Sequence, residues 1–223
     1  MKYSQFLDEL NTYAEKPFAL FQQKLIFTKQ TILGVRTPVL RALAKKYAAY
    51  IQEFLSFPDE YYEVTFIKLT MISRLPYHLF VEYLPTCVNW IDNWATCDSF
   101  RAKCIIKHKD EFLPVLQSIF EKGTEFTQRY VLVSLLAYYV NEPYLATVYE
   151  YLRAADCSKF YVHMACAWLT AEVVVKAFDF GIRILQDKLL PIRTYNKAIQ
   201  KAMESYRLTQ EQKERLRSLK IKS

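Results

Sequence analysis

Glycine is scarce in this chain: only Gly34, Gly123 and Gly181 occur among 223 residues. Folds rich in strands or phosphate-binding loops need more glycine than this, because glycine tolerates the backbone angles of tight turns. Between the glycines run long segments with apolar residues at helical spacing. Hydrophobic residues make up 52% of the chain, which is enough for a substantial core. We therefore predict an all-α protein.

Helix-start signals recur along the chain at similar intervals. Each is a residue that can cap a helix or a proline suited to its first turn. Three of the intervals measure 35, 35 and 32 residues, and each holds two amphipathic segments. This is the period of helix-pair repeats, so we predict a curved α-solenoid of HEAT-like helix pairs forming one domain over residues 1–223; an irregular helical domain is the alternative. The starts lie near Thr37, Pro58, Asn93, Thr124, Pro143, Lys159, Pro191 and Thr209, and Gly123 is placed to end a helix.

The net charge of +7 is concentrated near the C-terminal end of the sequence. Residues 1–180 hold 19 Lys and Arg against 19 Asp and Glu, whereas residues 181–223 hold 11 against 4. Basic charge gathered in one region favours a polyanionic partner, with nucleic acid first. A well-solvated terminal helix explains the charge equally well.

The sequence also bears on the cellular location of the protein and on its association with membranes. We find no signal-peptide pattern and no run of about 18 uncharged apolar residues. Five cysteines without a C-x-x-C motif are typical of reduced thiols. We expect a cytoplasmic monomer that does not enter a membrane.

One candidate site lies in the stretch N-W-A-T-C-D-S-F, Asn93 to Phe100. Trp94 and Asp98 are four residues apart, which places them on one face of a helix. Asp98 either caps a helix that begins at Ser99, with Trp94 in the core, or lies inside a helix that begins earlier. In the second case the carboxylate stands beside aromatic surface and needs a compensating cation, because an unpaired buried carboxylate is costly.

Two further residues have open alternatives. Arg129 lies near the start of a strongly apolar helix. It is either a rim arginine that reaches solvent or a residue that contacts phosphate. Trp168 is surrounded by small residues. It is either an indole in the core or an aromatic platform on a concave face.

Other chemistries have little support. Cys104 and His108 offer two metal ligands, but a structural zinc site needs four, so we expect no metal and no other cofactor. His78 and His163 have no recognisable nucleophile beside them in the sequence. No lysine is marked out as a nucleophilic amine.

The sequence resembles the AlkD-like family of DNA alkylation repair proteins over nearly its whole length. The resemblance is carried by G-V-R-T-P-V-L-R-A-L-A-K (Gly34 to Lys45), W-A-T-C-D-S-F (Trp94 to Phe100), the helix led by Arg129, and A-W-L-T-A-E around Trp168. The segment T-Y-N-K-A-I-Q-K-A-M-E-S-Y-R, Thr194 to Arg207, resembles a block in shorter members.

This resemblance implies an enzyme and its site. Active members are curved stacks of HEAT-like helix pairs that remove cationic N3- or N7-alkylated purines from duplex DNA as glycosylases. It implies Asp98 as the catalytic carboxylate, Trp94 and Trp168 as lesion contacts and Arg129 as a phosphate contact. We add Lys197, Lys201 and Arg207 as expected DNA contacts because of their charge.

The chemistry fits the residues. An alkylated purine with positive charge is already a good leaving group, and positive charge builds on the sugar as the N-glycosidic bond breaks. A carboxylate stabilises that charge, and indole faces attract a cation. We therefore predict a monofunctional DNA glycosylase. The alternatives are a non-catalytic HEAT-repeat module that binds DNA and a protein-interaction scaffold.

Overall fold

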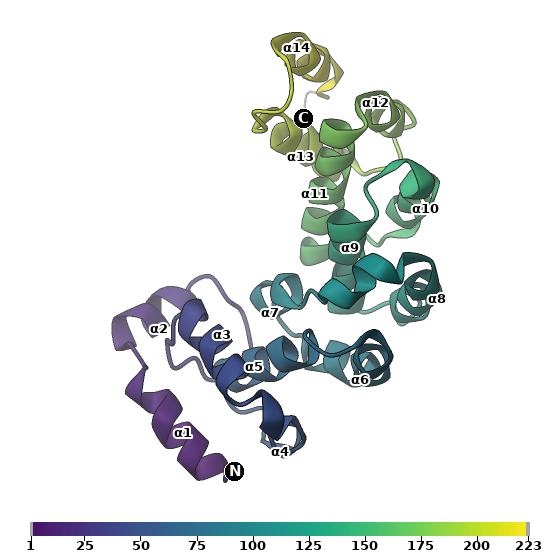
Figure 1. The fold of residues 1–223 in the computed structure, drawn as a ribbon. Coiled ribbons are helices and arrows are strands. Elements are labelled where there is room, and N and C mark those ends of the chain that lie inside the picture. Colours follow the sequence, from purple (N-terminus) through teal and green to yellow (C-terminus); the bar gives the residue numbers. More distant parts are fainter. Residues whose placement is uncertain (1, 222–223) are drawn as a thin grey trace. The chain divides into compact units, whose positions relative to one another are not determined.

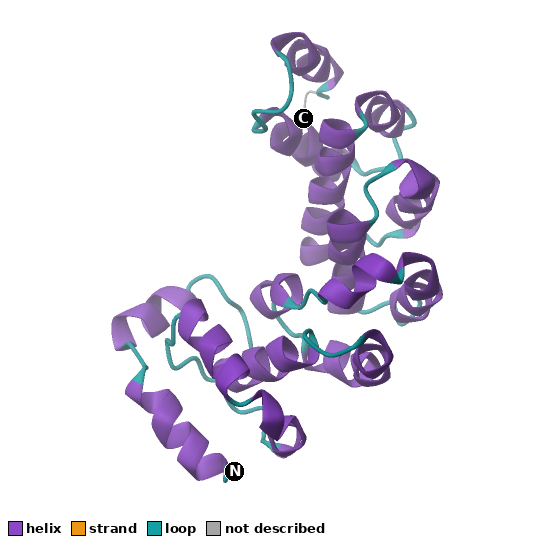
Figure 2. Cartoon of the chain, in the orientation of Figure 1, coloured by secondary structure: helices purple, strands orange, loops and turns teal. Residues whose placement is uncertain are grey.

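The protein is described by a computed structural model covering residues 2–221. Over these residues the chain forms fourteen α-helices and three short 3-10 helices, and no strand (Figure 2). The all-α prediction is therefore confirmed. The helices divide into two compact units, residues 1–108 and residues 109–223, which we describe separately. That one repeat domain spans residues 1–223 stays a prediction.

The N-terminal unit is built around one central helix, α5. This helix contacts α3, α4, α6 and α7, and every residue from 62 to 69 is buried. A helix that is buried all round lacks a polar face, which explains why its sequence has no amphipathic pattern. The helices of this unit are α1 (Tyr3–Thr12), α2 (Lys16–Gln23), α3 (Thr37–Lys46), α4 (Ile51–Ser56), α5 (Tyr62–Ile72), α6 (Tyr77–Trp90) and α7 (Trp94–Ser99).

Two buried charged residues of α5 fasten the loops around it. The Glu63 carboxylate accepts hydrogen bonds from the backbone N–H groups of residues 33–35, at 2.8 to 3.2 Å. The Lys68 ammonium donates to the Phe57 carbonyl and lies 2.9 Å from Asp59 Oδ1. It also lies 4.9 Å from the centre of the Trp90 ring. These contacts hold the loop at residues 33–35 and the segment just before α5 against the central helix.

The C-terminal unit stacks its helices in two layers. Helices α9, α11 and α13 follow one another in one layer, and α8, α10 and α12 form the other (Figure 1). This stacking of successive helix pairs is solenoid-like, as predicted. The helices are α8 (Lys109–Phe120), α9 (Glu125–Tyr138), α10 (Leu145–Ala154), α11 (Phe160–Lys176), α12 (Phe178–Gln186), α13 (Ile192–Met203) and α14 (Gln210–Leu219).

Gly181 allows α11 and α12 to approach each other closely. A Cβ atom on Gly181 would lie 2.5 Å from Val174 Cα, so glycine is required for this approach. Helix α13 is amphipathic: residues 194, 195, 198, 199 and 202 are buried. This leaves Lys197 and Lys201 on the other side of the helix, where both are half-buried.

Several predicted helix starts are confirmed. Asn93, Thr124 and Thr209 cap α7, α9 and α14, and each side chain accepts a hydrogen bond from a backbone N–H of the first turn. The starts predicted at Thr37 and Pro58 are wrong in detail. Thr37 is the first residue of α3 rather than its cap, and α5 begins at Tyr62. Over residues 2–221, no helix combines the length and apolarity that crossing a bilayer requires.

Candidate functional site

Helix α7 carries Trp94 and Asp98 on successive turns. The Asn93 side chain accepts a hydrogen bond from Thr96 N at 3.0 Å and so fixes the start of the helix before Trp94. Asp98 therefore lies inside this short helix, and its alternative placement as a cap before Ser99 is wrong. The preceding residue, Asp92, accepts hydrogen bonds from the Thr28 hydroxyl at 2.7 Å and from Lys29 N at 3.0 Å. The start of α7 is thus tied to the loop after α2.

The indole of Trp94 is held in place by a single hydrogen bond. Its Nε1–H donates to the Leu25 carbonyl at 2.8 Å, and the side chain is half-buried. The half-buried ring therefore bonds to the loop after α2 while it packs against the hydrophobic core of this unit. Its orientation is set before any ligand arrives.

Trp94 and Asp98 line the same pocket within the N-terminal unit. The pocket has a volume of about 270 Å³. Its walls are largely aromatic and aliphatic, and they include Phe18 and Phe21 of α2, of which Phe21 is 56% exposed. Sequence reasoning missed these two phenylalanines because α2 is far from α7 in the chain. An apolar exposed side chain beside a carboxylate suits a ligand that is both flat and cationic.

Asp98 also borders a second, larger pocket that is basic. This pocket has a volume of about 940 Å³. Its rim carries four exposed cations, and Arg74 also donates to the Arg41 carbonyl at 3.4 Å. Such a cluster suits phosphate groups. The cations are Arg41, Arg74, Arg101 and Lys103.

The basic pocket was not predicted from the sequence. Residues 1–180 are neutral overall, so the charge count pointed only to the C-terminal segment. The available signal was local: Arg101 and Lys103 follow Asp98 within five residues. Arg41 and Arg74 join them only through the packing of α3 and α5.

In the C-terminal unit, Arg129 is a buried support for Trp168. The Arg129 side chain is 1% exposed, and its Nη1 donates to the Tyr161 carbonyl at 2.9 Å. The guanidinium carbon lies 5.2 Å from the centre of the Trp168 ring. The alternative of a solvent-reaching rim arginine is therefore wrong. That Arg129 contacts a phosphate stays a prediction.

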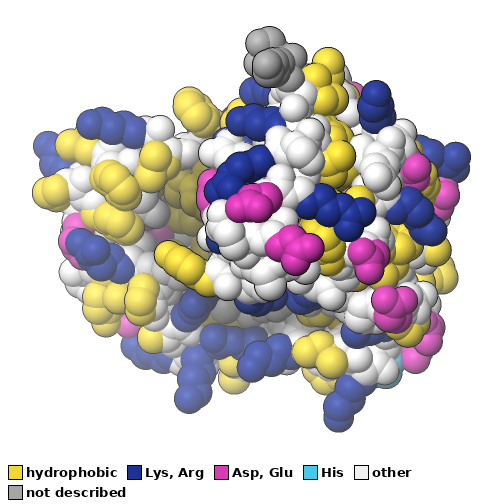
Figure 3. Space-filling model, turned by 90° about the horizontal axis from the view of Figure 1, so that it is seen from above, with side chains coloured by type: hydrophobic (Ala, Val, Ile, Leu, Met, Phe, Trp, Pro, Cys, Tyr) yellow, Lys and Arg dark blue, Asp and Glu magenta, His cyan; other side chains and the backbone are white. Residues whose placement is uncertain are grey.

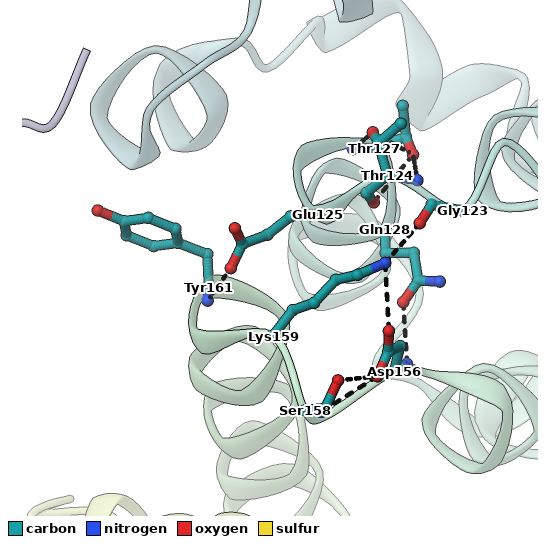
Figure 4. Close-up of polar contacts among 9 residues, drawn as sticks. All are labelled: Gly123, Thr124, Glu125, Thr127, Gln128, Asp156, Ser158, Lys159 and Tyr161. Carbon is teal, nitrogen blue, oxygen red and sulfur yellow. Dashed lines mark hydrogen bonds and ion pairs between the residues drawn. The ribbon is translucent and has the colours of Figure 1, made fainter.

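Polar contacts join the starts of α9 and α11, the helices that carry Arg129 and Trp168 (Figure 4). The Glu125 carboxylate accepts a hydrogen bond from Tyr161 N at 2.7 Å. The Lys159 ammonium donates to the Gly123 carbonyl at 2.7 Å and lies 3.1 Å from Asp156 Oδ2. These bonds join the first turn of each helix to the other, and so they fix the register in which Arg129 meets Trp168.

We expect substitution of Arg129 to destabilise the C-terminal unit. In Arg129→Met the hydrogen bond to Tyr161 and the cation over Trp168 are both lost, which should lower the free energy of unfolding by about 1.5–3 kcal/mol. Urea unfolding followed by circular dichroism measures this. The matched control is Arg207→Met, because Arg207 is exposed and pairs with Glu172 at the surface; its loss should stay below about 1 kcal/mol. Native stability of Arg129→Met would contradict the supporting role.

Trp168 is half-buried and lines a shallow pocket rather than lying wholly in the core. The pocket has a volume of about 360 Å³ and is also lined by Lys201 and Arg207. Three predicted residues of this unit therefore come together. The acid Glu172 lies among them and pairs with Arg207 at 2.9 Å and with Lys176 at 3.1 Å.

Lys197 lies apart from that group. It lines another pocket of the same unit, with Arg193, Lys220 and the exposed Phe160. Arg207 itself is in the loop between α13 and α14, beside the fully exposed Tyr206. Sequence reasoning missed Tyr206, although an exposed aromatic residue beside an arginine is a common nucleic-acid contact.

The excess positive charge near the C-terminal end is partly neutralised. Lys201 pairs with Glu204 at 2.8 Å, and Arg215 lies 3.9 Å from Asp179. On the face seen in Figure 3, Lys and Arg side chains are interspersed with Asp and Glu. This face is therefore mixed in charge.

His108 and Lys68 are held in contacts within the N-terminal unit. His108 stacks on Tyr77 with ring centres 4.2 Å apart, and over residues 2–221 no three His, Cys, Asp or Glu side chains are close enough to hold a metal ion. Lys68 is a buried lysine that sequence reasoning did not single out, and its ammonium is engaged by Phe57 and Asp59.

The chain matches a known protein family over most of its length. Residues 6–176 match the family model described as DNA alkylation repair enzyme. The matched range includes Trp94, Asp98, Arg129 and Trp168, and it ends before Lys197. No curated protein matches the chain.

Proposed function

Because the chain belongs to the AlkD-like family of DNA alkylation repair enzymes, we propose that it is a monofunctional DNA glycosylase for cationic N3- and N7-alkylated purines. The observation that carries this proposal is the position of Asp98. Its carboxylate borders an aromatic pocket on one side and a basic pocket on the other. A cationic base, a sugar that gains positive charge and an anionic phosphate are adjacent in alkylated DNA, and these two pockets match that order of charges.

The reaction needs few groups. The N-glycosidic bond breaks with its electron pair leaving on the purine, whose positive charge is thereby neutralised. The sugar becomes cationic at C1′, and the Asp98 carboxylate stabilises this charge and orients a water molecule that adds there. The face of Trp94 and the rings of Phe18 and Phe21 provide electron-rich surface for the cation. No general acid is needed for the departing base.

We assign binding of the DNA phosphate backbone to the basic pocket. Arg41, Arg74, Arg101 and Lys103 are exposed around it, and guanidinium groups bind phosphate oxygens in a bidentate manner. In the C-terminal unit, we assign further duplex contacts to Trp168, Lys201 and Arg207, with Arg129 holding Trp168 in place. Lys197 contributes a separate charge.

A non-catalytic DNA-binding module is the second candidate, because the exposed cations serve binding equally well.

We also propose that the protein acts as a monomer in the cytoplasm, where its five free thiols remain reduced.

The test is base release from a methylated duplex. The wild-type chain should liberate N3-methyladenine and N7-methylguanine faster than buffer alone and leave abasic sites. Duplex binding that weakens with salt, without release of any base, would favour the binding module. Negligible affinity for duplex at low salt would reject both DNA functions and leave a protein-interaction scaffold.

A further inference from the structure

Exposed apolar side chains gather on α2 and the loop that follows it. Of the ten large hydrophobic residues that are exposed among residues 2–221, four lie between positions 20 and 27. They are Leu20, Phe21, Leu25 and Phe27, and Phe27 is the most exposed of the four, at 71%. Exposed apolar residues that are scattered singly are normal, whereas such a cluster marks a surface that contacts a partner.

The loop around Phe27 is ordered. Ile26, directly before it, is buried. Directly after it, the Thr28 hydroxyl and the next backbone N–H both donate to Asp92 Oδ2, at 2.7 and 3.0 Å. The Phe27 ring is therefore exposed because it lies between anchored neighbours, and the contacts on each side hold its backbone in place.

This loop adjoins the aromatic pocket of Asp98. Leu25 and Ile26 belong to the pocket wall, and the Leu25 carbonyl accepts the hydrogen bond from the Trp94 indole at 2.8 Å. Phe27 follows directly in the chain but is not a wall residue. Its backbone is thus fixed next to the pocket, while its side chain is left to contact something else.

The charge of the segment indicates an anionic partner. Residues 16–30 contain Lys16, Lys24 and Lys29 but no Asp or Glu, and all three lysines are exposed. Aromatic side chains between cations suit nucleic acid, because bases stack on rings while phosphates meet lysines. An anionic membrane surface attracts the same residues, but the position of the loop beside the Asp98 pocket favours DNA.

The pocket itself explains why an exposed ring is useful here. In the proposed reaction the aromatic pocket takes the cationic purine, and a base reaches such a pocket only by leaving the stack of the duplex. Leaving the stack costs free energy and opens a gap between the neighbouring base pairs. Proteins that distort DNA fill such gaps with apolar side chains, phenylalanine among them.

We propose that Phe27 is a wedge that inserts between base pairs beside the lesion, with Lys24 and Lys29 on the flanking phosphates. The ring takes the stacking place that the alkylated purine gives up, and so it stabilises the unstacked state. Phe27 is a positioning residue, because it touches DNA away from the bond that breaks. This inference rests on the proposed glycosylase function, since it assigns the Asp98 pocket to the lesion.

The first test measures unstacking without chemistry. The probe is a duplex with one 2′-fluoro N7-methylguanine, whose fluorine slows release of the base, and with 2-aminopurine as the neighbouring base. Saturating wild-type protein should raise the 2-aminopurine fluorescence, Phe27→Ala should not, and Phe27→Leu should retain most of the rise because leucine is also an apolar wedge. The same rise with Phe27→Ala as with the wild type would overturn the proposal.

The matched control is Tyr50→Ala. Tyr50 is an exposed aromatic residue of the same unit, and it lines neither pocket of Asp98. This variant should give the wild-type rise in fluorescence. Thermal unfolding of Phe27→Ala should match the wild type, because a ring that is 71% exposed adds little to the core.

The second test compares base release from paired and mismatched duplexes. Phe27→Ala should release N7-methylguanine about 5–100-fold more slowly than the wild type when the lesion faces cytosine, the range expected for loss of one base–aromatic stack. The deficit should shrink when the lesion faces thymine, because a mismatched base leaves the stack at lower cost. A purely structural defect would slow both duplexes by the same factor, and that result would reject the wedge.

The outcomes separate this inference from the glycosylase proposal. A Phe27-dependent rise in fluorescence without release of any base by the wild type would reject the reaction and support the wedge. Base release without such a rise would reject the wedge alone. Phe27-dependent binding to vesicles of phosphatidylcholine and phosphatidylserine, with no rise on the duplex, would assign the loop to a membrane surface and also overturn the proposal.

Discussion

Asp98→Asn should lower the rate of base release from methylated duplex by about 10²–10³-fold, which corresponds to roughly 2.7–4 kcal/mol of transition-state stabilisation. Asparagine keeps the size and planarity of the side chain but removes its negative charge. The charge that builds on the sugar then has no carboxylate beside it, while the aromatic and basic walls of the two pockets are unchanged. Single-turnover release measures the rate, and fluorescence anisotropy on the same preparation measures duplex affinity.

The control for this loss is Asp179→Asn. Asp179 lies on α12 with a side chain that is 97% exposed, so its substitution removes an equal charge from the other unit. It should release base at the wild-type rate. If Asp98→Asn also released base at that rate, or if it lost duplex affinity in the same proportion as activity, the role given to the carboxylate would be rejected.

Glu63→Ala should unfold the N-terminal unit or leave it barely stable. The carboxylate is 0% exposed and accepts the N–H groups of Leu33, Gly34 and Val35, which would have no acceptor in the variant. Each buried donor left unpaired costs about 1–3 kcal/mol, so the total should be at least about 3 kcal/mol of a stability near 5–15 kcal/mol. The segment is also held from its other side, because the Gly34 carbonyl accepts a hydrogen bond from Glu15 N at 3.2 Å.

Thermal unfolding measures this loss, with two controls. Glu60→Ala removes an exposed carboxylate that accepts none of these three hydrogen bonds, so it should leave stability unchanged. Glu63→Gln keeps an oxygen acceptor and should fold. A fully stable Glu63→Ala chain would show that the loop does not depend on Glu63.

Glu63 also gives the stability a pH dependence of known sign. Burial raises its pKa above the ordinary value of 4.5, against the lowering effect of the backbone hydrogen bonds. The folded chain therefore holds the Glu63 proton more tightly than the unfolded chain does. This contribution to stability is fully present below pH 4.5 and is lost as the pH rises through the raised pKa. The dependence should be absent in Glu63→Gln.

The sequence predicted those features that depend on neighbouring residues. Capping side chains act within their own first turn, so Asn93, Thr124 and Thr209 could be recognised without a structure. The four-residue spacing of Trp94 and Asp98 likewise placed both on one helix face. The start at Pro58 was wrong because the following residues serve a distant element: the Thr31 backbone bonds to Glu60 and Tyr62, which delays α5 until Tyr62.

The features that escaped prediction are those assembled by packing. The basic pocket joins cations of α3 and the α5–α6 turn to those that follow α7, and no count along the chain reveals it. The burial of Arg129 against Trp168 depends on the contact of α9 with α11.

The central claim is that a carboxylate acts here by meeting positive charge, and the charge of the lesion tests it most directly. Two duplexes of identical sequence would carry either one N7-methylguanine, which is cationic, or one neutral hypoxanthine at the same position. At saturating wild-type protein, base release should be well above the spontaneous rate for N7-methylguanine and indistinguishable from it for hypoxanthine. Comparable release of both bases would show that the site protonates a neutral leaving group, and the account given for Asp98 would then be wrong.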